Sequence, residues 1–275
     1  MTTDMELVLI ILAVLLLLLG LYCLLVMGRK GHPGLKALQG WAYAHRGLHG
    51  DGRPENSMAA FRAALENGYG IELDLHLLAD GNLAVIHDAS LKRTAGKDVL
   101  IEDLSTEDLK TCFLEDTFQT IPTFQEVLQL FDGKAPLIVE LKAERNNCAA
   151  LVDTAVAQLS DYKGTYCIES FDPRCVRHLK KHYPKIIRGQ LAENFLTSKG
   201  NLSWIIKFIM THQLVNFLLQ PDFVSYRFCD RKSLGNFLVR KLWGVQGVTW
   251  TVRSLKDHKT AVEEGWIPIF EGYKP

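Results

Sequence analysis

Several features that mark particular classes of protein are absent from this chain. Its 31 basic and 31 acidic side chains cancel, and no basic stripe with interleaved aromatic residues occurs, so the sequence does not favour a nucleic-acid partner. No Gly-x-Gly-x-x-Gly loop follows an apolar strand, which argues against a dinucleotide-binding open sheet. The six cysteines are scattered without a Cys-x-x-Cys pair, and no paired-histidine site accompanies them, so zinc is not expected.

One uncharged apolar run, residues 7–26, is long enough as a helix to cross the roughly 30 Å hydrocarbon core of a bilayer. It lacks the positive start, the shorter apolar core and the small-residue cleavage site of a secretory signal. Acidic residues precede it and basic residues follow it: Asp4, Glu6, Arg29, Lys30 and Lys36. The sequence therefore predicts a single-pass membrane anchor (residues 1–28), a linker (29–40) and a domain in the cytoplasm (41–275).

Residues 41–275 alternate short apolar runs with helical patterns. Strands are predicted at residues 42–44, 71–75, 83–86, 137–141, 166–169, 186–190, 222–225, 247–252 and 267–270. Helices are predicted at residues 57–67, 123–131, 148–159, 173–182, 232–241 and 255–264, with Asn56 as the N-cap of the first. Repeated strand and helix units indicate a parallel sheet, and about eight of them favour an α/β fold of the (β/α)₈ TIM barrel type over a doubly wound open sheet.

Two segments depart from a plain barrel. The chain spends about 50 residues between His87 and the strand at 137–141, more than one helix needs, so residues 89–121 are predicted to form a small inserted subdomain. Residues 202–220 are apolar nearly all round but are interrupted by a lysine and a histidine, so a second membrane span is not expected. Two interpretations of this segment stay open, a helix packed on the barrel and a helix resting on the bilayer surface.

Alternating residues in the second predicted strand place Glu72, Asp74 and His76 on one face and leucines on the other. In a parallel sheet both faces are covered, and neighbouring buried carboxylates resist ionisation unless a cation accompanies them. The alternative is an antiparallel strand with a solvated acidic face. The strand at 137–141 repeats the pattern with Glu140 and Lys142, so three carboxylates can converge on a hard cation at the mouth of a barrel.

Seven short motifs occur in order over nearly everything after residue 40. They are His45-Arg46-Gly47, Pro54-Glu55-Asn56-Ser57 leading into Ala60-Phe61, Glu72-Leu73-Asp74, Asp80-Gly81 with His87-Asp88, Glu140-Leu141-Lys142, Ser170-Phe171 and Trp250-Thr251-Val252. In this order and spacing they resemble the glycerophosphodiester phosphodiesterase family. The resemblance implies a phospholipase C-like phosphodiesterase TIM barrel, with an insertion that covers the glycerol end of the substrate.

By this resemblance, Glu72, Asp74 and Glu140 are the ligands of one divalent cation, either Mg²⁺ or Ca²⁺. His45 and His87 then divide the proton transfers as acid and base, since imidazole is poised near neutrality. Three further residues are expected to bind the phosphate or the substrate: Arg46, Lys142 and Trp250.

Glu55 and His76 are additional site candidates, against the alternatives of a helix-start charge and a structural histidine. The family usually has asparagine where Arg253 stands and an acidic residue near Glu271 in a somewhat different setting. It also has a final helix, which is not seen before Pro275. We expect the position of that eighth helix to be empty or filled by another segment.

The predicted function is metal-dependent hydrolysis of a glycerophosphodiester to an alcohol and sn-glycerol 3-phosphate. The predicted anchor makes the bilayer a partner and lysophospholipids attractive substrates, in a lysophospholipase D reaction. One alternative is a phospholipase C-like barrel that releases cyclic phosphates. Another is a catalytically inactive, membrane-tethered binding barrel, although all five polar positions expected for catalysis are retained: His45, Glu72, Asp74, His87 and Glu140.

Overall fold

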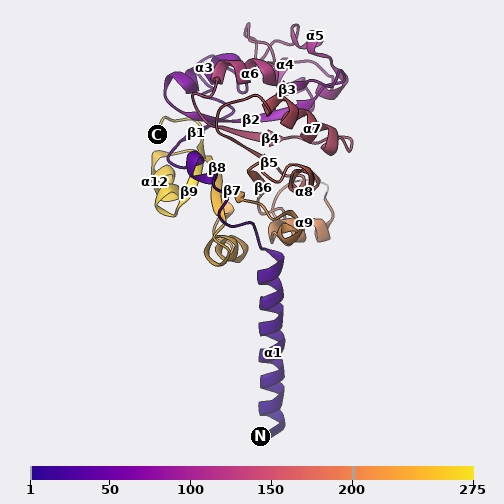
Figure 1. The fold of residues 1–275 in the computed structure, drawn as a ribbon, viewed down its shortest axis with the longest axis vertical. Coiled ribbons are helices and arrows are strands. Elements are labelled where there is room, and N and C mark those ends of the chain that lie inside the picture. The colour runs from indigo at the N-terminus through magenta and orange to yellow at the C-terminus, as the bar shows by residue number, and fades with distance from the viewer. Residues whose placement is uncertain (1, 200–201) are drawn as a thin grey trace.

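The computed structural model describes residues 2–199 and 202–275, with a closed barrel of parallel strands at its centre (Figure 1). The barrel strands follow the chain in order: β1 (Tyr43–His45), β2 (Gly70–Leu77), β4 (Leu137–Leu141), β5 (Tyr166–Ser170), β6 (Arg188–Ala192), β7 (Phe223–Arg227), β8 (Gln246–Val252) and β9 (Trp266–Phe270). β1 pairs with both β2 and β9, which closes the sheet. The predicted TIM barrel is confirmed, and the open-sheet alternative is wrong.

The strand predicted at residues 83–86 is present as β3 (Leu83–Val85) but lies outside the barrel. It pairs antiparallel with the end of β2, where Leu77 is opposite Leu83. The connection between them is a short hairpin, because a parallel crossover needs a dozen or more residues. The hairpin returns the chain to the barrel mouth, where the Ile86 amide donates to the Asp74 carbonyl and His87 follows.

Helices cover the outside of the barrel between successive strands. They are α3 (Met58–Glu66), α6 (Phe124–Phe131), α7 (Cys148–Leu159), α8 (Pro173–His182), α9 (Trp204–Thr211), α10 (Asn216–Leu219), α11 (Leu234–Phe237) with a π-helical turn η3 (Leu238–Leu242), and α12 (Leu255–Glu263), while α2 (Leu35–Leu38) precedes β1. Local capping fixes several starts. Thr123 and Glu126 form a reciprocal capping box at α6, and Asp172 caps α8, which has Pro173 in its first turn.

α1 (Thr2–Leu25) projects from the barrel as a long helix (Figure 1). An 18-residue window of its segment Asp4–Leu25 has a mean hydropathy of 3.2 and is 0% buried, so by length and composition the helix can cross a membrane. The end of the helix is packed, because Val26 is fully buried in a hydrophobic cluster with residues of β7 and η3. Trp243 Nε1 also donates to the Cys23 carbonyl at 2.7 Å. α1 is therefore attached directly to the side of the barrel.

Residues 89–121 contain α4 (Lys92–Ala95), η1 (Ile101–Asp103) and α5 (Thr106–Leu109) and lie at the end of the molecule away from α1 (Figure 1). Their buried side chains form a separate hydrophobic cluster around Ile101 and Leu109, which continues through Ala84 and Ile86 beside β3. The segment is thus carried by the β2–β3 hairpin.

The residues after β9 pack between α12 and α3. The Tyr273 ring lies 5.5 Å from Phe270 and 6.0 Å from His258 of α12. Lys274 Nζ bonds Asn67 at the end of α3. Residues 273–274 therefore contact both α12 and the end of α3.

A buried ion pair at the start of β7 ties the linker to the barrel and leads to a stability prediction. Asp222 is fully buried and accepts from Arg29 Nη2 at 2.6 Å and from the Arg188 amide at 3.0 Å. Asp222→Ala would leave these donors unpaired, so we expect the free energy of unfolding to fall by roughly 2–4 kcal/mol. Thermal unfolding in detergent measures this change.

The matched control for this prediction is Asp153→Ala. Asp153 is about half exposed and pairs with His178 on the surface, so its loss should cost less than about 1 kcal/mol. Equal destabilisation by the two variants would contradict a structural role for Asp222.

Candidate active site

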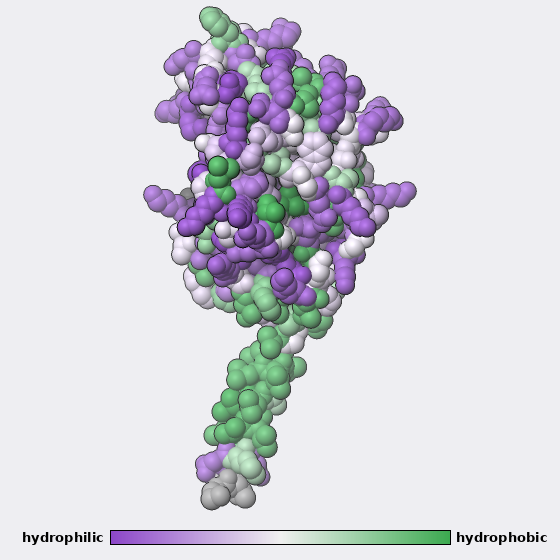
Figure 2. Space-filling view, turned by 90° about the vertical axis from the view of Figure 1, so that its left-hand side faces the viewer, coloured by the Kyte–Doolittle hydropathy of each residue, from purple (hydrophilic) through white to green (hydrophobic). Residues whose placement is uncertain are grey.

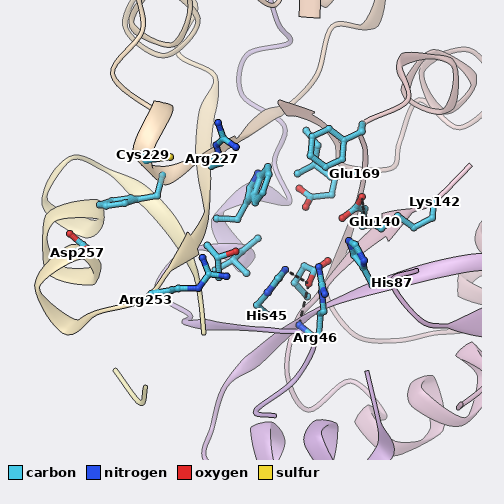
Figure 3. Close-up of a pocket in the computed structure, with 17 residues that line it drawn as sticks. His45, Arg46, His87, Glu140, Lys142, Glu169, Arg227, Cys229, Arg253 and Asp257 are labelled. Carbon is cyan, nitrogen blue, oxygen red and sulfur yellow. Dashed lines mark hydrogen bonds and ion pairs between the residues drawn. The ribbon is translucent and has the colours of Figure 1, made fainter. Parts of the chain in front are cut away.

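A cavity of about 460 Å³ opens at the carboxyl ends of the barrel strands (Figure 3). Charged residues from β1, β2, β4 and β5 line one side of it. Apolar residues from the β5 to β8 half line much of the other side: Phe171, Leu191, Phe228 and Trp250. The cavity therefore offers a ligand one charged side and one more apolar side, and Arg227, Arg253 and Asp257 also line the latter.

The first motif forms a tight turn at the end of β1. Gly47 has φ +80°, and a Cβ there would come within 2.9 Å of the Ala60 carbonyl carbon in α3, so glycine is required. Arg46 has φ 55°; its amide donates to Glu72 Oε2 at 3.2 Å, and its Nε lies 3.4 Å from Asp74 Oδ2. The turn thus directs Arg46 toward the acidic face of β2.

Asn56 has a different role from the one predicted. The hydroxyl of Ser57 accepts from the Ala60 amide at 3.1 Å and caps α3, so the prediction of Asn56 as the N-cap is wrong. The Asn56 side chain instead donates to Asp74 Oδ2 at 2.8 Å. Because serine caps a helix as well as asparagine does, the Asn56 amide is free to hold a carboxylate of β2.

Three buried carboxylates converge at the cavity. Glu72, Asp74 and Glu140 each offer an oxygen, and these atoms lie within 4.8 Å of one another. β2 and β4 are parallel neighbours with Asp74 opposite Glu140, which fixes the spacing. None of the three residues is more than 6% exposed, so the alternative of a solvated acidic face is wrong. A set of oxygen donors of this kind fits a hard divalent cation.

The charges of this cluster are unbalanced. Burial and the nearby Asp74 and Glu140 raise the pKa of Glu72 well above its usual value, and burial raises the pKa of Glu140 to about 7. Although burial opposes its charge, the pKa of Asp74 is lowered by Lys142 and Arg46. Lys142 Nζ lies 2.6 Å from Glu140 Oε1 and 3.1 Å from Asp74 Oδ1. The basic residues therefore stabilise one carboxylate, and a further cation would stabilise the other two.

Two histidines face the cavity, and each has a carboxylate at Nδ1. His45 Nδ1 lies 2.5 Å from Glu271 Oε2, and His87 Nδ1 lies 2.6 Å from Asp88 Oδ1. Burial lowers the pKa of both imidazoles. Figure 3 shows His45 beside Arg46 and His87 beside Glu140 and Lys142. Because Nδ1 is occupied in each ring, Nε2 is the atom left to exchange a proton with a ligand.

A chain of ion pairs connects Glu55 with His87. Glu55 Oε1 accepts from Arg46 Nη1 at 3.0 Å and from Arg93 Nη2 at 2.6 Å. Arg93, in α4, also donates from Nε to Asp88 Oδ2 at 2.5 Å. Glu55 therefore lies within the site and holds two arginines.

Trp250 and His76 differ in their relation to the cavity. Trp250 lines it, with its ring edge-on to Phe171 at a centroid distance of 5.5 Å and Nε1 donating to the Ser225 carbonyl. His76 is buried, and its Nε2 lies 3.2 Å from the His87 carbonyl. Trp250 is thus placed to contact a ligand, whereas His76 supports the backbone that carries His87.

Two acidic residues of the site were not singled out from the sequence. Glu169 in β5 lines the cavity, and its buried Oε2 has no hydrogen-bond partner within residues 2–199 and 202–275. Strand alternation like that of β2 was the available signal for it. Glu271 is the partner of His45, but it follows β9 at the far end of the chain, so only the closure of the barrel brings the two together.

Several curated proteins with related sequences carry names from one reaction class. A glycerophosphodiester phosphodiesterase from Bacillus altitudinis is 41% identical over 111 residues, covering 38% of this chain and 45% of that protein. One from Caldanaerobacter subterraneus is 28% identical over 232 residues, covering 81% of this chain and 89% of that protein. A lysophospholipase D from Rattus norvegicus is 34% identical over 128 residues, covering 42% of this chain and 40% of that protein. The matches thus span less than half of two relatives and most of the third.

A solved structure and a family model extend the comparison. The structure of an Oleispira antarctica phosphodiesterase in complex with sn-glycerol-3-phosphate matches with a TM-score of 0.70 at 21% identity, covering 84% of this chain and 92% of that one, which shows a shared fold. The model of the glycerophosphoryl diester phosphodiesterase family matches residues 45–271. The resemblance seen in the motifs is confirmed, and the chain belongs to the glycerophosphoryl diester phosphodiesterase family.

Proposed function

We propose that this chain hydrolyses a glycerophosphodiester to an alcohol and sn-glycerol 3-phosphate. The observation that carries the proposal is the pair of histidines, each held by a carboxylate at Nδ1, beside three convergent carboxylates. A phosphodiester carries one negative charge, and charge on its non-bridging oxygens must be stabilised during attack. Arg46 and Lys142 bring positive charge to the same cavity.

Glu72, Asp74 and Glu140 are the residues that would hold a divalent cation, Mg²⁺ or Ca²⁺. Their convergent oxygens and the raised pKa values of Glu72 and Glu140 fit such an ion. When bound, the ion would act as a Lewis acid on a phosphoryl oxygen. Glu169 Oε2, which has no hydrogen-bond partner among the described residues, adds a further oxygen beside the cluster that favours a cation.

The two histidines carry out the proton transfers at Nε2. One imidazole accepts the proton of the attacking water or hydroxyl, and the other donates a proton to the oxygen of the leaving alcohol. Burial lowers both pKa values and favours the neutral rings, while Glu271 and Asp88 stabilise whichever ring becomes charged. The two carboxylates also hold the rings in the orientation that leaves Nε2 toward the cavity.

Product analysis tests this function. The full-length chain would be incubated with glycerophosphocholine and a divalent ion, and the phosphorus-containing products followed by NMR. We expect sn-glycerol 3-phosphate to accumulate. A cyclic phosphate as the final product would support the phospholipase C-like alternative, and no turnover with any divalent ion would support the inactive binding barrel.

Lysophospholipids are the second candidate substrate. The apolar side of the cavity, with Phe171, Leu191 and Phe228, offers contacts that an acyl-bearing substrate can use and glycerophosphocholine cannot. The name of the rat relative supports the same class. In the same assay we expect lysophosphatidylcholine to yield lysophosphatidic acid and choline, and an absence of these products would remove this candidate.

We also propose that α1 anchors the chain in a membrane and that the barrel lies in the cytoplasm. A cleaved signal would separate from the fold, whereas Tyr22, Cys23 and Val26 pack among barrel residues. Acidic residues precede the span and Lys30 follows it, which favours this orientation. Protease added outside intact cells should leave the barrel uncut, and digestion of the barrel would overturn the orientation.

We propose that residues 89–121 form an inserted subdomain over the glycerol end of the substrate, and that Arg93 in this subdomain is a positioning residue. Arg93→Ala breaks the link between Glu55 and Asp88, so we expect kcat to fall roughly tenfold with little change in KM. Without Arg93, the Asp88 carboxylate favours the charged form of His87 more strongly, which should move the limb of the kcat profile that His87 sets to higher pH.

Lys92→Ala is the matched control, because Lys92 is the exposed neighbour of Arg93 on α4. It should leave kcat and the pH profile unchanged. An Arg93→Ala enzyme with the kcat and pH profile of the control would contradict the positioning role.

A further inference from the structure

Exposed apolar side chains gather on one flank of the barrel. They lie on α9, α10 and α11, which follow β6 and β7, and the exposed faces of these three helices are called the apolar collar. Trp204 is 68% exposed, Ile205 64% and Phe237 61%, and Phe208, Phe217 and Leu234 are also exposed. On α9, only Met210 and Thr211 are buried. Exposed apolar clusters of this kind mark contact surfaces rather than ordinary solvated surface.

The apolar collar lies beside the point where α1 leaves the barrel. The Tyr22 ring lies 6.4 Å from His212, which directly follows α9. Tyr22 also approaches α11 so closely that a Cβ on Gly235 would lie 2.9 Å from its hydroxyl, and the same Cβ would lie 3.5 Å from the His212 carbonyl oxygen. Figure 1 shows α9 beside the upper end of α1. In Figure 2, hydrophobic side chains continue from α1 onto the underside of the folded part.

This arrangement fixes the level of the apolar collar relative to a membrane. The unburied part of α1 has the length of one bilayer core, so its end near Tyr22 would lie at the lipid–water interface. Helices packed around that end must then lie at the same level. Aromatic side chains and lysine stems are favoured there, and the apolar collar contains the stacked pair Trp204 and Phe208 beside Lys207.

We propose that the apolar collar rests on the bilayer surface and holds the barrel on its side against the membrane. The inference rests on the membrane span proposed for α1. It resolves the two interpretations of residues 202–220, because one edge of this segment packs on the barrel while the other contacts lipid.

Figure 1 shows β7 and β8 nearer α1 than β2 and β4, so the same orientation turns the apolar side of the cavity toward the membrane. The segment between β6 and α9 carries Phe195, whose ring lies 6.0 Å from Phe171 at the edge of the cavity. Phe171 in turn contacts Trp250. Phe195 therefore extends the apolar side of the cavity into the segment that precedes α9.

Quenching of tryptophan fluorescence by lipids brominated near the headgroup tests the proposal. The full-length chain is reconstituted in phosphatidylcholine vesicles with and without brominated lipid, and flotation confirms that α1 is inserted. We expect Trp204→Phe to remove a large part of the quenching seen in the wild type. Adding Phe237→Trp to Trp204→Phe should restore it, because α11 packs against the same end of α1.

Phe118→Trp in the same Trp204→Phe background is the control. Phe118 is 96% exposed, but it lies in residues 89–121 at the end of the molecule away from α1, so it should add no quenching. If the chain floats and neither Trp204 nor Phe237→Trp is quenched, the apolar collar does not touch lipid, and the anchor still stands. If the chain forms a dimer in detergent in which a second copy covers the apolar collar, the apolar collar does not contact lipid, and the proposal is also overturned. A chain that does not float would overturn both the anchor and the collar.

Discussion

His87→Asn is expected to lower kcat/KM for glycerophosphocholine by a factor of roughly 10² to 10⁴, the range typical of a general acid or base. The ring has one exchangeable nitrogen left, because Asp88 holds Nδ1 at 2.6 Å, so removal of Nε2 removes the proton transfer itself. His45→Gln is expected to have an effect of similar size, since Glu271 holds its Nδ1 in the same way. Steady-state rates of choline release measure both variants.

His178→Gln provides the control for these variants. His178 lies on α8 and pairs with Asp153 away from the cavity, so this substitution should leave kcat/KM unchanged. If either active-site variant retained the wild-type rate, that histidine would have no part in proton transfer.

The second large effect is the dependence of stability on pH when divalent ions are removed. In the folded chain the pKa of Glu140 is raised by burial to about 7 from an ordinary 4.5. A carboxyl group with a raised pKa supports folding fully below its unfolded pKa, and this contribution is lost as the pH rises through the folded pKa. With a chelator present, the free energy of unfolding of Glu140→Gln should therefore rise by about 3 kcal/mol relative to that of the wild type as the pH goes from 4.5 to 7.

The comparison with Glu140→Gln isolates this carboxyl group from the histidines. The lowered pKa values of His45 and His87 act in the opposite direction, because neutral rings favour the folded state as the pH rises toward 6.5. Those contributions are common to both proteins and cancel. Denaturation at a series of pH values measures the difference.

Addition of Mg²⁺ or Ca²⁺ should reverse the order of stability above pH 7. The ion binds the ionised carboxylates of the wild type and stabilises its folded state, whereas Glu140→Gln has lost one ligand. If the wild type and Glu140→Gln gained the same stability from each ion at every pH, this would contradict a cation site at these three residues.

Strand periodicity together with the family motifs predicted the acidic core of the site, whereas periodicity alone left a solvated acidic face open. Alternation in β2 and β4 places Glu72, Asp74 and Glu140 on the inner face, and parallel pairing then brings them together. The barrel was predictable for a related reason, because buried parallel strands separated by helices leave few other arrangements. β3 pairs antiparallel with β2 because the connection between them is too short for a parallel crossover. The predicted strand positions did not take the length of this connection into account.

Contacts between distant segments were not predictable from local patterns. Glu271 reaches His45 only because β9 closes against β1. Arg93 joins Glu55 and Asp88 only because residues 89–121 fold back over the barrel mouth. Asn56 and Ser57 are both good helix caps, so the position of β2 decides that Asn56 binds Asp74 while Ser57 caps α3.

Release of choline and sn-glycerol 3-phosphate from glycerophosphocholine by the full-length chain, with a chelator and then with Mg²⁺ or Ca²⁺ restored, tests the central claim most directly. The account predicts turnover that stops in the chelator, returns with one of the ions, and is absent from Glu72→Gln at the same ion concentration. Turnover that continues unchanged in the chelator, or that Glu72→Gln retains in full, would contradict a phosphodiesterase site built on these carboxylates.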